Sequence, residues 1–420
     1  MDKILIHGGH PLSGSIKVSG SKNSSLPILA ATLLTREPCI VHRVPDLSDT
    51  HYMLQILIAS RRASGTRQRN SHGGGRERAI GRALRCRAQN ARFGLRARPL
   101  LGRCKEATVS MPGGCVIGDR PIDLHLKGFE ALGAAVRVEG GNIKVFAPKL
   151  RGAVINLRGK FGPTVLGTDN VMMAAVLAEG TTVIEGAAQE PEVVDLANFL
   201  NKMGAKIEGA GTRRLIIEGV KELHGVEHDI IPDRIEAGTF LVAGAICGKG
   251  ITIKRVTPEH VKAVTNALGN CGFRLEATGD SISVSPNGET KPLELATEPY
   301  PGFPTDMQAQ MCALLSTTDG ISVITENIFP QRYMHVAELT RMGAHVDLEG
   351  ATAVIQGVDH LFGAPVMASD LRASAALVLA GLKADGITEV SRVYHIDRGY
   401  EHLDEKLSEL GAHIERVKAA

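Results

Sequence analysis

Hydrophobic and polar positions along the chain repeat with a period of about 70 residues. Five segments show an apolar pattern with helical spacing that stops at a glycine. These glycines are Gly133, Gly204, Gly272, Gly343 and Gly411, spaced 71, 68, 71 and 68 residues apart. Glycine suits the position after a helix because it adopts the left-handed conformation without steric cost. A short alternation of apolar and polar residues follows each glycine and predicts a strand, as at residues 135–138 and 205–208.

A second set of helices, rich in Ala, Gly, Val and Leu, is predicted between these segments. Its members are residues 171–177, 239–246, 310–315 and 374–382, and residues 25–34 form a similar helix near the N-terminus. Strands such as 181–185 and 250–254 follow them. Helices that are apolar all round are buried, so we expect sheets packed around them. Six helix–strand–helix–strand repeats of about 70 residues, in two sets of three, predict an α/β fold with two similar domains.

Composition agrees with two domains, because 420 residues are too many for one ordinary core. With 43% hydrophobic and 22% charged residues, the chain is typical of a soluble α/β protein. No apolar run approaches the ~20 residues of a membrane span, and the N-terminus does not resemble a signal peptide. Seven scattered cysteines without a Cys-x-x-Cys pair or a Cys/His cluster indicate neither a zinc site nor a disulfide framework. We therefore expect a cytoplasmic protein without a metal or an organic cofactor.

Positive charge is concentrated in one segment. Residues 61–98 hold twelve Arg, no Lys and one acid, Glu77, so their charge is +11, whereas the whole chain has +3 and the remainder −8. Overall basicity is therefore no argument for nucleic-acid binding. A sixth helix-ending glycine is due near residue 65. Gly65 stands there, but no apolar periodicity surrounds it, so we regard this repeat as degraded.

Arg/Gly/Ser/Ala-rich sequence without Lys is typical of GC-rich coding DNA read in a shifted frame, and we interpret residues 58–98 in this way. Permitted codons for residues 87–99, read one base later, allow Val-Arg-Lys-Met-Arg-Ala-Ser-Val and a continuation that joins Leu100 smoothly. A disordered basic linker and an RNA-binding arm stay open as alternatives. Sequencing the coding DNA distinguishes them, because an intact single frame without compensating insertions or deletions excludes the frameshift.

The most informative motif is Met111–Pro121, which sets Cys115 behind two glycines and five residues ahead of Arg120. Gly113 and Gly114 let the backbone bend and approach a ligand closely. A nearby cation lowers the pKa of a thiol and makes it a better nucleophile or acid. The alternative is a small buried hydrophobe in a glycine turn.

Further segments combine with this loop and the repeat into one recognisable pattern. They are residues 19–26, 112–124, 190–195, 232–236, 300–306 and 394–400. Together they resemble the UDP-N-acetylglucosamine 1-carboxyvinyltransferases, the enolpyruvyl transferases of peptidoglycan synthesis. The resemblance covers nearly the whole chain apart from about residues 58–98. The shifted reading also resembles the Met-Arg-Ala-Ser motif of this family.

The resemblance implies a fold of two inside-out α/β barrels, each built of three repeats. Residues 1–20 with residues 231–420 are expected to form the domain that carries Asp306 and Arg398. Residues 21–230 are expected to form the domain that carries the Cys115 loop. The family reaction transfers the enolpyruvyl group of phosphoenolpyruvate to the 3′-hydroxyl of UDP-N-acetylglucosamine and releases phosphate. The implied partners are these small molecules, with no nucleic acid and no membrane.

The resemblance also implies roles for single residues. Cys115 matches the catalytic general acid, and Asp306 matches the proposed base for the sugar hydroxyl. The matches to phosphoenolpyruvate-binding positions are Lys22, Asn23, Arg120 and Arg398. The matches to UDP-N-acetylglucosamine-binding positions are Asn23, Arg120, Pro121, Ile122, Asp123, Leu124, Lys160, Asp306 and Ile328. Arg332, Asp370 and Arg372 are expected to support the site, and Glu190 is a further match. Arginine suits such sites because its charge is permanent and it bonds to anions in pairs.

Purely structural interpretations stay open beside these roles. Asp306 also fits a turn or an N-cap ahead of a helix that begins at Gln308. Each arginine by itself also fits a solvated surface charge, least of all Arg372, because an apolar helix follows it directly. The loop that follows Lys160 departs from the family pattern and looks shortened. The family's substrate-binding arginine of Met-Arg-Ala-Ser would fall near residue 91, where this chain has Ala91 beside Arg92.

Three other functions stay open. The shikimate-pathway enolpyruvyl transferase shares the fold, but the Cys115 loop and residues 120–124 argue against it. An inactive relative that retains nucleotide-sugar binding predicts binding without turnover. A nucleic-acid-binding protein that uses the Arg-rich segment predicts steeply salt-dependent affinity, although the segment lacks Lys, interleaved aromatics and a known motif.

Overall fold

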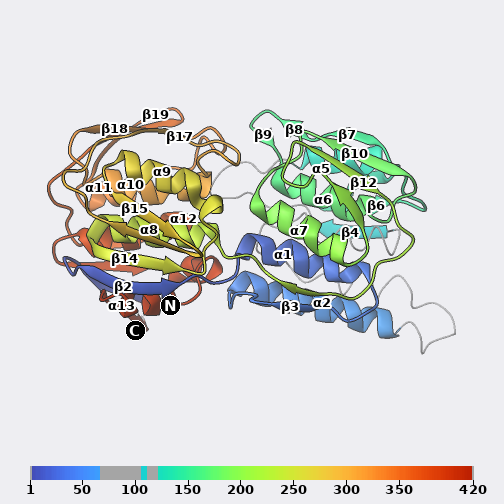
Figure 1. Cartoon of the computed structure of the whole chain (residues 1–420), viewed down its shortest axis with the longest axis horizontal. Coiled ribbons are helices and arrows are strands. Elements are labelled where there is room, and N and C mark those ends of the chain that lie inside the picture. Colours follow the sequence, from blue (N-terminus) through green and yellow to red (C-terminus); the bar gives the residue numbers. More distant parts are fainter. Residues whose placement is uncertain (1, 67–105, 111–121, 419–420) are drawn as a thin grey trace. The chain divides into compact units, whose positions relative to one another are not determined.

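The chain forms two compact units, one of which contains both chain ends (Figure 1). The computed structural model describes residues 2–66, 106–110 and 122–418. Among these, residues 2–20 and 232–418 form the first unit, which we name the terminal unit. The described residues between 21 and 231 form the second, which we name the middle unit.

Three four-stranded sheets with the same arrangement build the terminal unit. The order β15–β16–β14–β2 joins strands Arg274–Thr278, Ser281–Ser285, Gly248–Lys254 and Leu12–Lys17. The order β17–β18–β20–β19 joins Glu294–Ala296, Ile321–Thr325, Thr352–Gln356 and His345–Glu349. The order β21–β22–β1–β23 joins Pro365–Met367, Ile387–Ser391, Asp2–His7 and His413–Lys418. In each sheet one edge strand pairs in parallel with its neighbour, and the other pairs are antiparallel.

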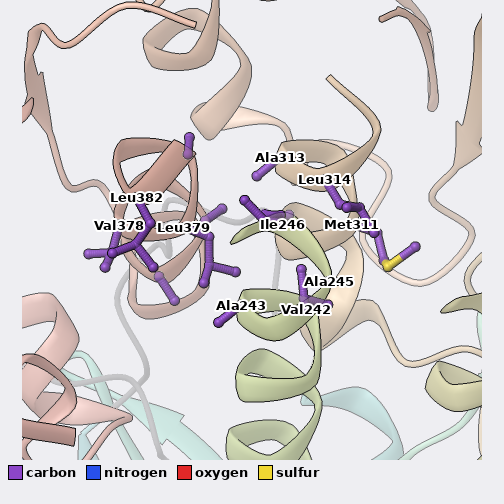
Figure 2. Close-up of a cluster of buried hydrophobic side chains, with 14 of the residues drawn as sticks. Val242, Ala243, Ala245, Ile246, Met311, Ala313, Leu314, Val378, Leu379 and Leu382 are labelled. Atoms are coloured by element: carbon purple, nitrogen blue, oxygen red, sulfur yellow. The ribbon is translucent and has the colours of Figure 1, made fainter. Parts of the chain in front are cut away.

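A parallel pair needs a crossover connection, and three buried helices serve these pairs. They are α8 (Arg234–Cys247), α10 (Gln308–Leu315) and α12 (Leu371–Lys383). Figure 2 shows apolar side chains of all three gathered into one cluster, among them Ile246, Leu314 and Leu379. Their many small residues allow close approach and burial on all sides, so the predicted buried helices are confirmed.

Amphipathic helices connect the second and third strands of each repeat. They are α9 (Lys262–Asn270), α11 (Met334–Arg341) and α13 (Leu403–Glu409). Each buries one apolar stripe, as α9 does with Val264, Ala267 and Leu268. Short 3₁₀ turns stand near the helix starts: η3 (Pro258–Val261), η4 (Thr305–Met307) and η5 (Val393–Arg398).

The N-terminal strands complete the repeats of the terminal unit. β1 lies between β22 and β23, which is the place that β20 takes between β18 and β19. β2 lies beside β14, which is the place that β17 takes beside β18. The first and last repeats therefore each take one strand from the N-terminus. The chain leaves the terminal unit between β2 and α8.

The middle unit follows the same arrangement as far as it is described. One sheet has the order β11–β12–β10–β7, with strands Lys206–Glu208, Arg214–Glu218, Thr181–Glu185 and Val154–Asn156. The order β4–β6–β5 joins Glu106–Ser110, Asn142–Phe146 and Ala135–Glu139. Two strand pairs are β13–β3 (Glu227–Asp229 and Ile40–His42) and β8–β9 (Arg158–Gly159 and Gly162–Pro163). The helices are α1 (Lys22–Ala31), η1 (Thr32–Leu34), α2 (Ser48–Thr66), α5 (Asp123–Ala131), α6 (Val165–Ala175) and α7 (Pro191–Lys202).

Besides the β8–β9 hairpin, two sheets of the middle unit have fewer than four strands among the described residues, β4–β6–β5 and β13–β3. Residues 67–105 lie outside the described part of the chain. The segment interpreted as frameshifted, residues 58–98, begins inside α2, which ends at Thr66. The rest of that segment lies outside the described residues, so the frameshift stays a prediction.

The predicted helix-ending glycines are confirmed. Each lies two residues beyond its helix, and their φ angles are 89°, 99°, 96°, 95° and 101° at Gly133, Gly204, Gly272, Gly343 and Gly411. The residue after each glycine donates its amide to the carbonyl five residues earlier, as Ala344 does to Leu339. This is the Schellman motif, which explains why glycine recurs with the period of the repeat. None of the described helices is long and apolar enough to cross a membrane.

Candidate active site

A carboxylate held between two buried arginines marks the terminal unit. Asp306 lies in η4, directly ahead of α10. Its Oδ1 accepts a hydrogen bond from Arg332 Nη1 at 2.8 Å, and its Oδ2 accepts one from Arg372 Nη2 at 3.0 Å. The side chains of the arginines are 5% and 1% exposed, whereas that of Asp306 is 26% exposed. A ligand can therefore reach the carboxylate from the side that the arginines leave open.

The structural interpretation of Asp306 as an N-cap does not hold. The N-cap of α10 is Met307, and no side chain caps this helix. Likewise, Arg332 and Arg372 are not solvated surface charges, because both are almost fully buried. Charge pairing, rather than helix capping, explains the position of this carboxylate.

The two guanidinium groups determine the charge of Asp306. Burial by itself would raise the pKa of this carboxyl group. The positive charges of Arg372 and Arg332 and their hydrogen bonds outweigh burial and hold the pKa well below its usual range. Asp306 is therefore ionised at neutral pH. It is a weak base as long as both arginines hold it.

Arg372 stands in the first turn of α12. The N-cap of this helix is Asp370, whose Oδ1 accepts hydrogen bonds from the backbone amides of Arg372 and Ala373 at 2.8 and 3.2 Å. The Cζ atom of Arg372 lies 5.3 Å from the centre of the Tyr400 ring. Its Nε and Nη1 make no hydrogen bond with the described residues. A buried guanidinium with unused donors is suited to binding an anion.

A second carboxylate, Glu326, organises the chain around Arg332 and is fully buried. Its four donors, at 2.7 to 2.9 Å, are the hydroxyls of Thr297 and Thr305 and the backbone amides of Ile328 and Phe329. The Thr305 hydroxyl also accepts from Arg332 Nη1 at 3.1 Å. Glu326 therefore links Ile328, a predicted sugar-binding position, to Thr305. Thr305 in turn contacts Arg332, which is paired with Asp306.

Tyr400 joins the central helices near this cluster. Its hydroxyl lies 2.9 Å from Thr239 Oγ1 in α8 and accepts from Gln310 Nε2 in α10 at 3.1 Å. The predicted anion-binding Arg398 lies two residues earlier, at the end of η5, and is partly buried. The structure therefore brings Asp306, Arg332 and Arg372 together, and it connects Tyr400 to them through Arg372.

In the middle unit, Lys22 and Asn23 open α1, whose N-cap is Ser21. Lys22 is 1% exposed, and its Nζ lies 2.9 Å from Asp49 Oδ2 in α2. An ammonium group is costly to bury unless it is paired, so Asp49 accounts for this buried cation. Asn23 is partly exposed.

The matched segment 190–195 also lies in the middle unit. Glu190 is the residue before α7, but its side chain does not cap that helix. Asp195 is buried and accepts hydrogen bonds from His228 Nε2 at 2.9 Å and from the Ser24 hydroxyl. Asp195, which ends the matched segment, therefore connects α7 to α1.

The residues expected to read the nucleotide are also in the middle unit. Ile122 precedes α5, and Asp123 and Leu124 form its first turn, with Asp123 exposed. Lys160 is exposed at the turn of the β8–β9 hairpin. A Cβ added to Gly159 would lie 3.0 Å from Leu124 Cδ1, so this hairpin adjoins the start of α5. The structure thus places the hairpin that carries Lys160 beside Leu124.

Cys115, Arg120 and Pro121 lie outside the described residues, as do Ala91 and Arg92, so their roles stay predictions. Three described cysteines are buried or nearly so, and burial raises their pKa to about 12 at Cys247, about 11 at Cys271 and about 12 at Cys312. Such thiols stay protonated and unreactive. Among the described residues, no group of three or more His, Cys, Asp or Glu is suited to hold a metal ion.

Reasoning from the sequence missed the partners that hold these residues. Glu326 follows directly after strand β18, and Asp49 stands in the first turn of α2, so both looked like ordinary polar residues at the ends of elements. Only Tyr400 carried a signal, because it ends the matched segment 394–400.

Comparisons with known proteins all find carboxyvinyl or enolpyruvyl transferases, although the reactions in their descriptions differ. A family model described as EPSP synthase (3-phosphoshikimate 1-carboxyvinyltransferase) matches residues 6–407. UDP-N-acetylglucosamine 1-carboxyvinyltransferases of Akkermansia muciniphila and Methylacidiphilum infernorum are 57% and 56% identical to the chain, over 99% of it and 99% of each relative. The crystal structure of the enolpyruvyl transferase NikO from Streptomyces tendae superposes with a TM-score of 0.83 at 24% identity, over 100% of this chain and 99% of that one. The predicted enolpyruvyl transferase fold, with its mixed α/β content, is therefore confirmed.

Proposed function

Because the chain belongs to the family of UDP-N-acetylglucosamine 1-carboxyvinyltransferases, we propose that it transfers the enolpyruvyl group of phosphoenolpyruvate to the 3′-hydroxyl of UDP-N-acetylglucosamine and releases phosphate. This is the first committed step of peptidoglycan synthesis, and we place it in the cytoplasm. The observation that carries the proposal is the buried Arg332–Asp306–Arg372 cluster. The reaction requires a base together with fixed positive charge for anionic substrates, and this cluster offers both.

The proposal assigns the anions of the substrates to arginine and lysine side chains. Lys22, Arg120 and Arg398 bind phosphoenolpyruvate, together with Asn23. Arg372 supports them, because its Nε and Nη1 are donors without a hydrogen-bond partner among the described residues. Guanidinium groups suit this task because they remain charged and bond to carboxylate and phosphate in pairs.

Asp306 takes the proton of the sugar hydroxyl in this proposal, but its low pKa opposes that role while both arginines hold it. An anion that binds beside Arg332 or Arg372 competes with Asp306 for the guanidinium groups. The pKa of Asp306 then rises towards the range of a useful base. Substrate binding and activation of the base are thereby coupled.

Two residues move the protons of the proposed reaction. As the sugar oxygen bonds to the central carbon of phosphoenolpyruvate, Asp306 accepts the hydroxyl proton. The Cys115 thiol gives its proton to the vinyl carbon, which becomes a methyl group. The Cys115 thiolate then takes a proton back from this methyl group as phosphate departs, which restores the double bond, and the proton held by Asp306 leaves with the released phosphate.

The nucleotide end of the sugar substrate is assigned to the middle unit. Arg120 and Pro121 together with Ile122, Asp123 and Leu124 bind the uridine, and Lys160 binds a phosphate. The proximity of the β8–β9 hairpin to Leu124 supports this assignment, because one uridine diphosphate can contact both. Asn23 and Ile328 contact the amino sugar.

Two alternatives rest on specific observations. The family model that matches residues 6–407 is described by the shikimate-pathway reaction, which keeps shikimate 3-phosphate as an alternative acceptor. The family motif has an arginine near residue 91, where this chain has Ala91 beside Arg92. This difference keeps open the alternative that the chain is an inactive relative that still binds the nucleotide sugar.

Phosphate release separates these functions. The assay is run with phosphoenolpyruvate and either acceptor, on this chain and on a version with the reading frame of residues 58–98 restored. We expect release with UDP-N-acetylglucosamine from the restored chain and none from its Cys115→Ala variant. Release only with shikimate 3-phosphate contradicts the proposal. Calorimetric binding of the nucleotide sugar without turnover in either version favours the inactive relative.

The epoxide fosfomycin, an inhibitor of this family, tests the reactivity of the Cys115 thiol separately. We expect mass spectrometry to find the adduct on Cys115. Cys247, Cys271 and Cys312 serve as internal controls, because their raised pKa values keep them protonated. An adduct on another cysteine would overturn the assignment of Cys115.

A further inference from the structure

The segment that carries Arg398 is anchored on the N-terminal side of this residue by an ion pair. Asp397, the residue before it, accepts two hydrogen bonds from Arg416, at 2.7 Å from Nη2 to Oδ1 and at 3.1 Å from Nη1 to Oδ2. This is a bidentate arrangement, which fixes the orientation of the two groups as well as their distance. Asp397 therefore cannot rotate without losing one of the two bonds.

A second anchor lies on the other side of Arg398. The hydroxyl of Tyr400, two residues later, is held by Thr239 and Gln310 at 2.9 and 3.1 Å. Tyr400 is buried, whereas Arg398 itself is only partly buried. The backbone of Arg398 is thus fixed between two side-chain contacts to other elements.

Arg416 is itself well held. Arg416 stands in β23, opposite Ile4 of β1. Strand β1 is an inner strand of this sheet. Its Nε donates to Asp404 Oδ2 at 3.2 Å, and its side chain is 28% exposed. Because a strand is more rigid than a short 3₁₀ turn, Arg416 restrains the position of Asp397 rather than the reverse.

We propose that Arg416 is a positioning residue that sets the place of Arg398 through Asp397. This inference rests on the proposed function for what Arg398 binds, namely phosphoenolpyruvate. The way in which Arg398 is held does not depend on it. A fixed position matters because a displacement of about 1 Å in a substrate-orienting group can lower the rate about 100-fold.

The pair is partly exposed, with Asp397 at 36%, so its contribution to stability is expected to be small. Removing it should therefore affect ligand binding more than folding. The chain offers a matched control in Arg274, which stands in β15, the strand that corresponds to β23 in another repeat. Arg274 is paired with Glu276 of its own strand and holds no segment of the candidate site.

The first test is steady-state kinetics of Arg416→Met, Arg416→Lys and the control Arg274→Met. We expect Arg416→Met to raise the KM for phosphoenolpyruvate about tenfold and to leave the KM for UDP-N-acetylglucosamine within about twofold. Arg416→Lys should lie in between, because lysine keeps the charge but loses the fork. In an Arg398→Met background, Arg416→Met should have no further effect. Additive effects, or equal changes in both KM values, would overturn the proposal.

The second test needs no turnover and therefore separates this inference from the proposed function. Phenylglyoxal modifies guanidinium groups, and peptide mass spectrometry reports the rate at each arginine. We expect Arg398 to react at least about threefold faster in Arg416→Met and Arg416→Lys than in the wild type, and at the wild-type rate in Arg274→Met. Equal rates at Arg398 in all four proteins contradict the positioning role. Faster modification without phosphate release from any version contradicts the proposed function and leaves the positioning role intact.

Discussion

Replacing Glu326 with Gln should loosen the candidate site of the terminal unit without changing the volume of the side chain. Glu326 is fully buried and accepts four hydrogen bonds. In the wild type, the Thr305 hydroxyl donates to Glu326 Oε2 at 2.8 Å. In Glu326→Gln, the amide group that replaces Oε2 faces this hydroxyl. Thr305 would then accept from both this amide and Arg332, and its own proton would lose its acceptor.

The expected magnitude follows from these bonds. A hydrogen bond to a charged group contributes about 1 kcal/mol more than a neutral one, so four weakened bonds cost about 4 kcal/mol. A neutral amide is easier to bury than a carboxylate, which offsets about half of this loss. We expect a net decrease of about 2 kcal/mol in the free energy of unfolding, or roughly 4–8 °C in the melting temperature of a unit of about 200 residues.

Calorimetry and urea unfolding of Glu326→Gln measure this loss. The matched control is Glu218→Gln, because Glu218 forms an exposed pair with Lys206 and its replacement should change stability by less than about 0.5 kcal/mol. A Thr305→Val variant and the double variant complete a cycle, in which we expect a coupling of about 1 kcal/mol. If Glu326→Gln unfolds at the same midpoint as the control, the reasoning about this buried carboxylate is wrong.

Three further predictions concern the stability contributed by Asp306 at low pH, by Glu236 near neutral pH and by the closely packed Gly219. The folded-state pKa of Asp306 lies below its unfolded value, so its ion pairs stabilise the fold above about pH 4 and are lost as the pH falls through the folded pKa. Unfolding midpoints of Asp306→Asn should therefore decrease less between pH 7 and pH 2 than those of the wild type. Burial raises the pKa of Glu236 to about 7, so the stabilisation from its bound proton is complete below about pH 4.3 and is lost as the pH rises to 7. Glu236→Gln should flatten the free energy of unfolding over that range, and an unchanged slope would contradict this assignment. An added Cβ at Gly219 would lie 1.6 Å from the carbonyl oxygen of Ala178, so Gly219→Ala should cost about 3 kcal/mol, whereas Gly269→Ala, which meets nothing within 4 Å, should be neutral or stabilising in the same urea titration.

Much of the fold was predictable because its signals are local. A glycine that ends a helix needs only its own left-handed backbone, so Gly133, Gly204 and their counterparts showed the repeat directly. The small-residue helices α8, α10 and α12 were equally visible from composition. The exchange of β1 and β2 between repeats was not predictable, because strand pairing joins residues hundreds of positions apart, such as Ile4 and Val390.

The candidate site was predictable only in part. Resemblance to a family predicts Asp306, Arg332 and Arg372 as site residues. It did not reveal that Asp306 is paired with both arginines and therefore starts as a weak base. That property depends on distances between elements, and the residues that determine it lie 26 and 66 positions from Asp306.

The amino-acid sequence by itself determined the repeat, the helices and strands within it, and the types of residue available for the chemistry. These follow from periodicity and turn conformation, which act over a few residues. Tertiary structure alone decided which side chains meet: Glu326 with Thr305, Lys22 with Asp49, and Arg416 with Asp397. The strength of a charge or hydrogen bond depends on burial and partners, and both arise only when distant segments pack together.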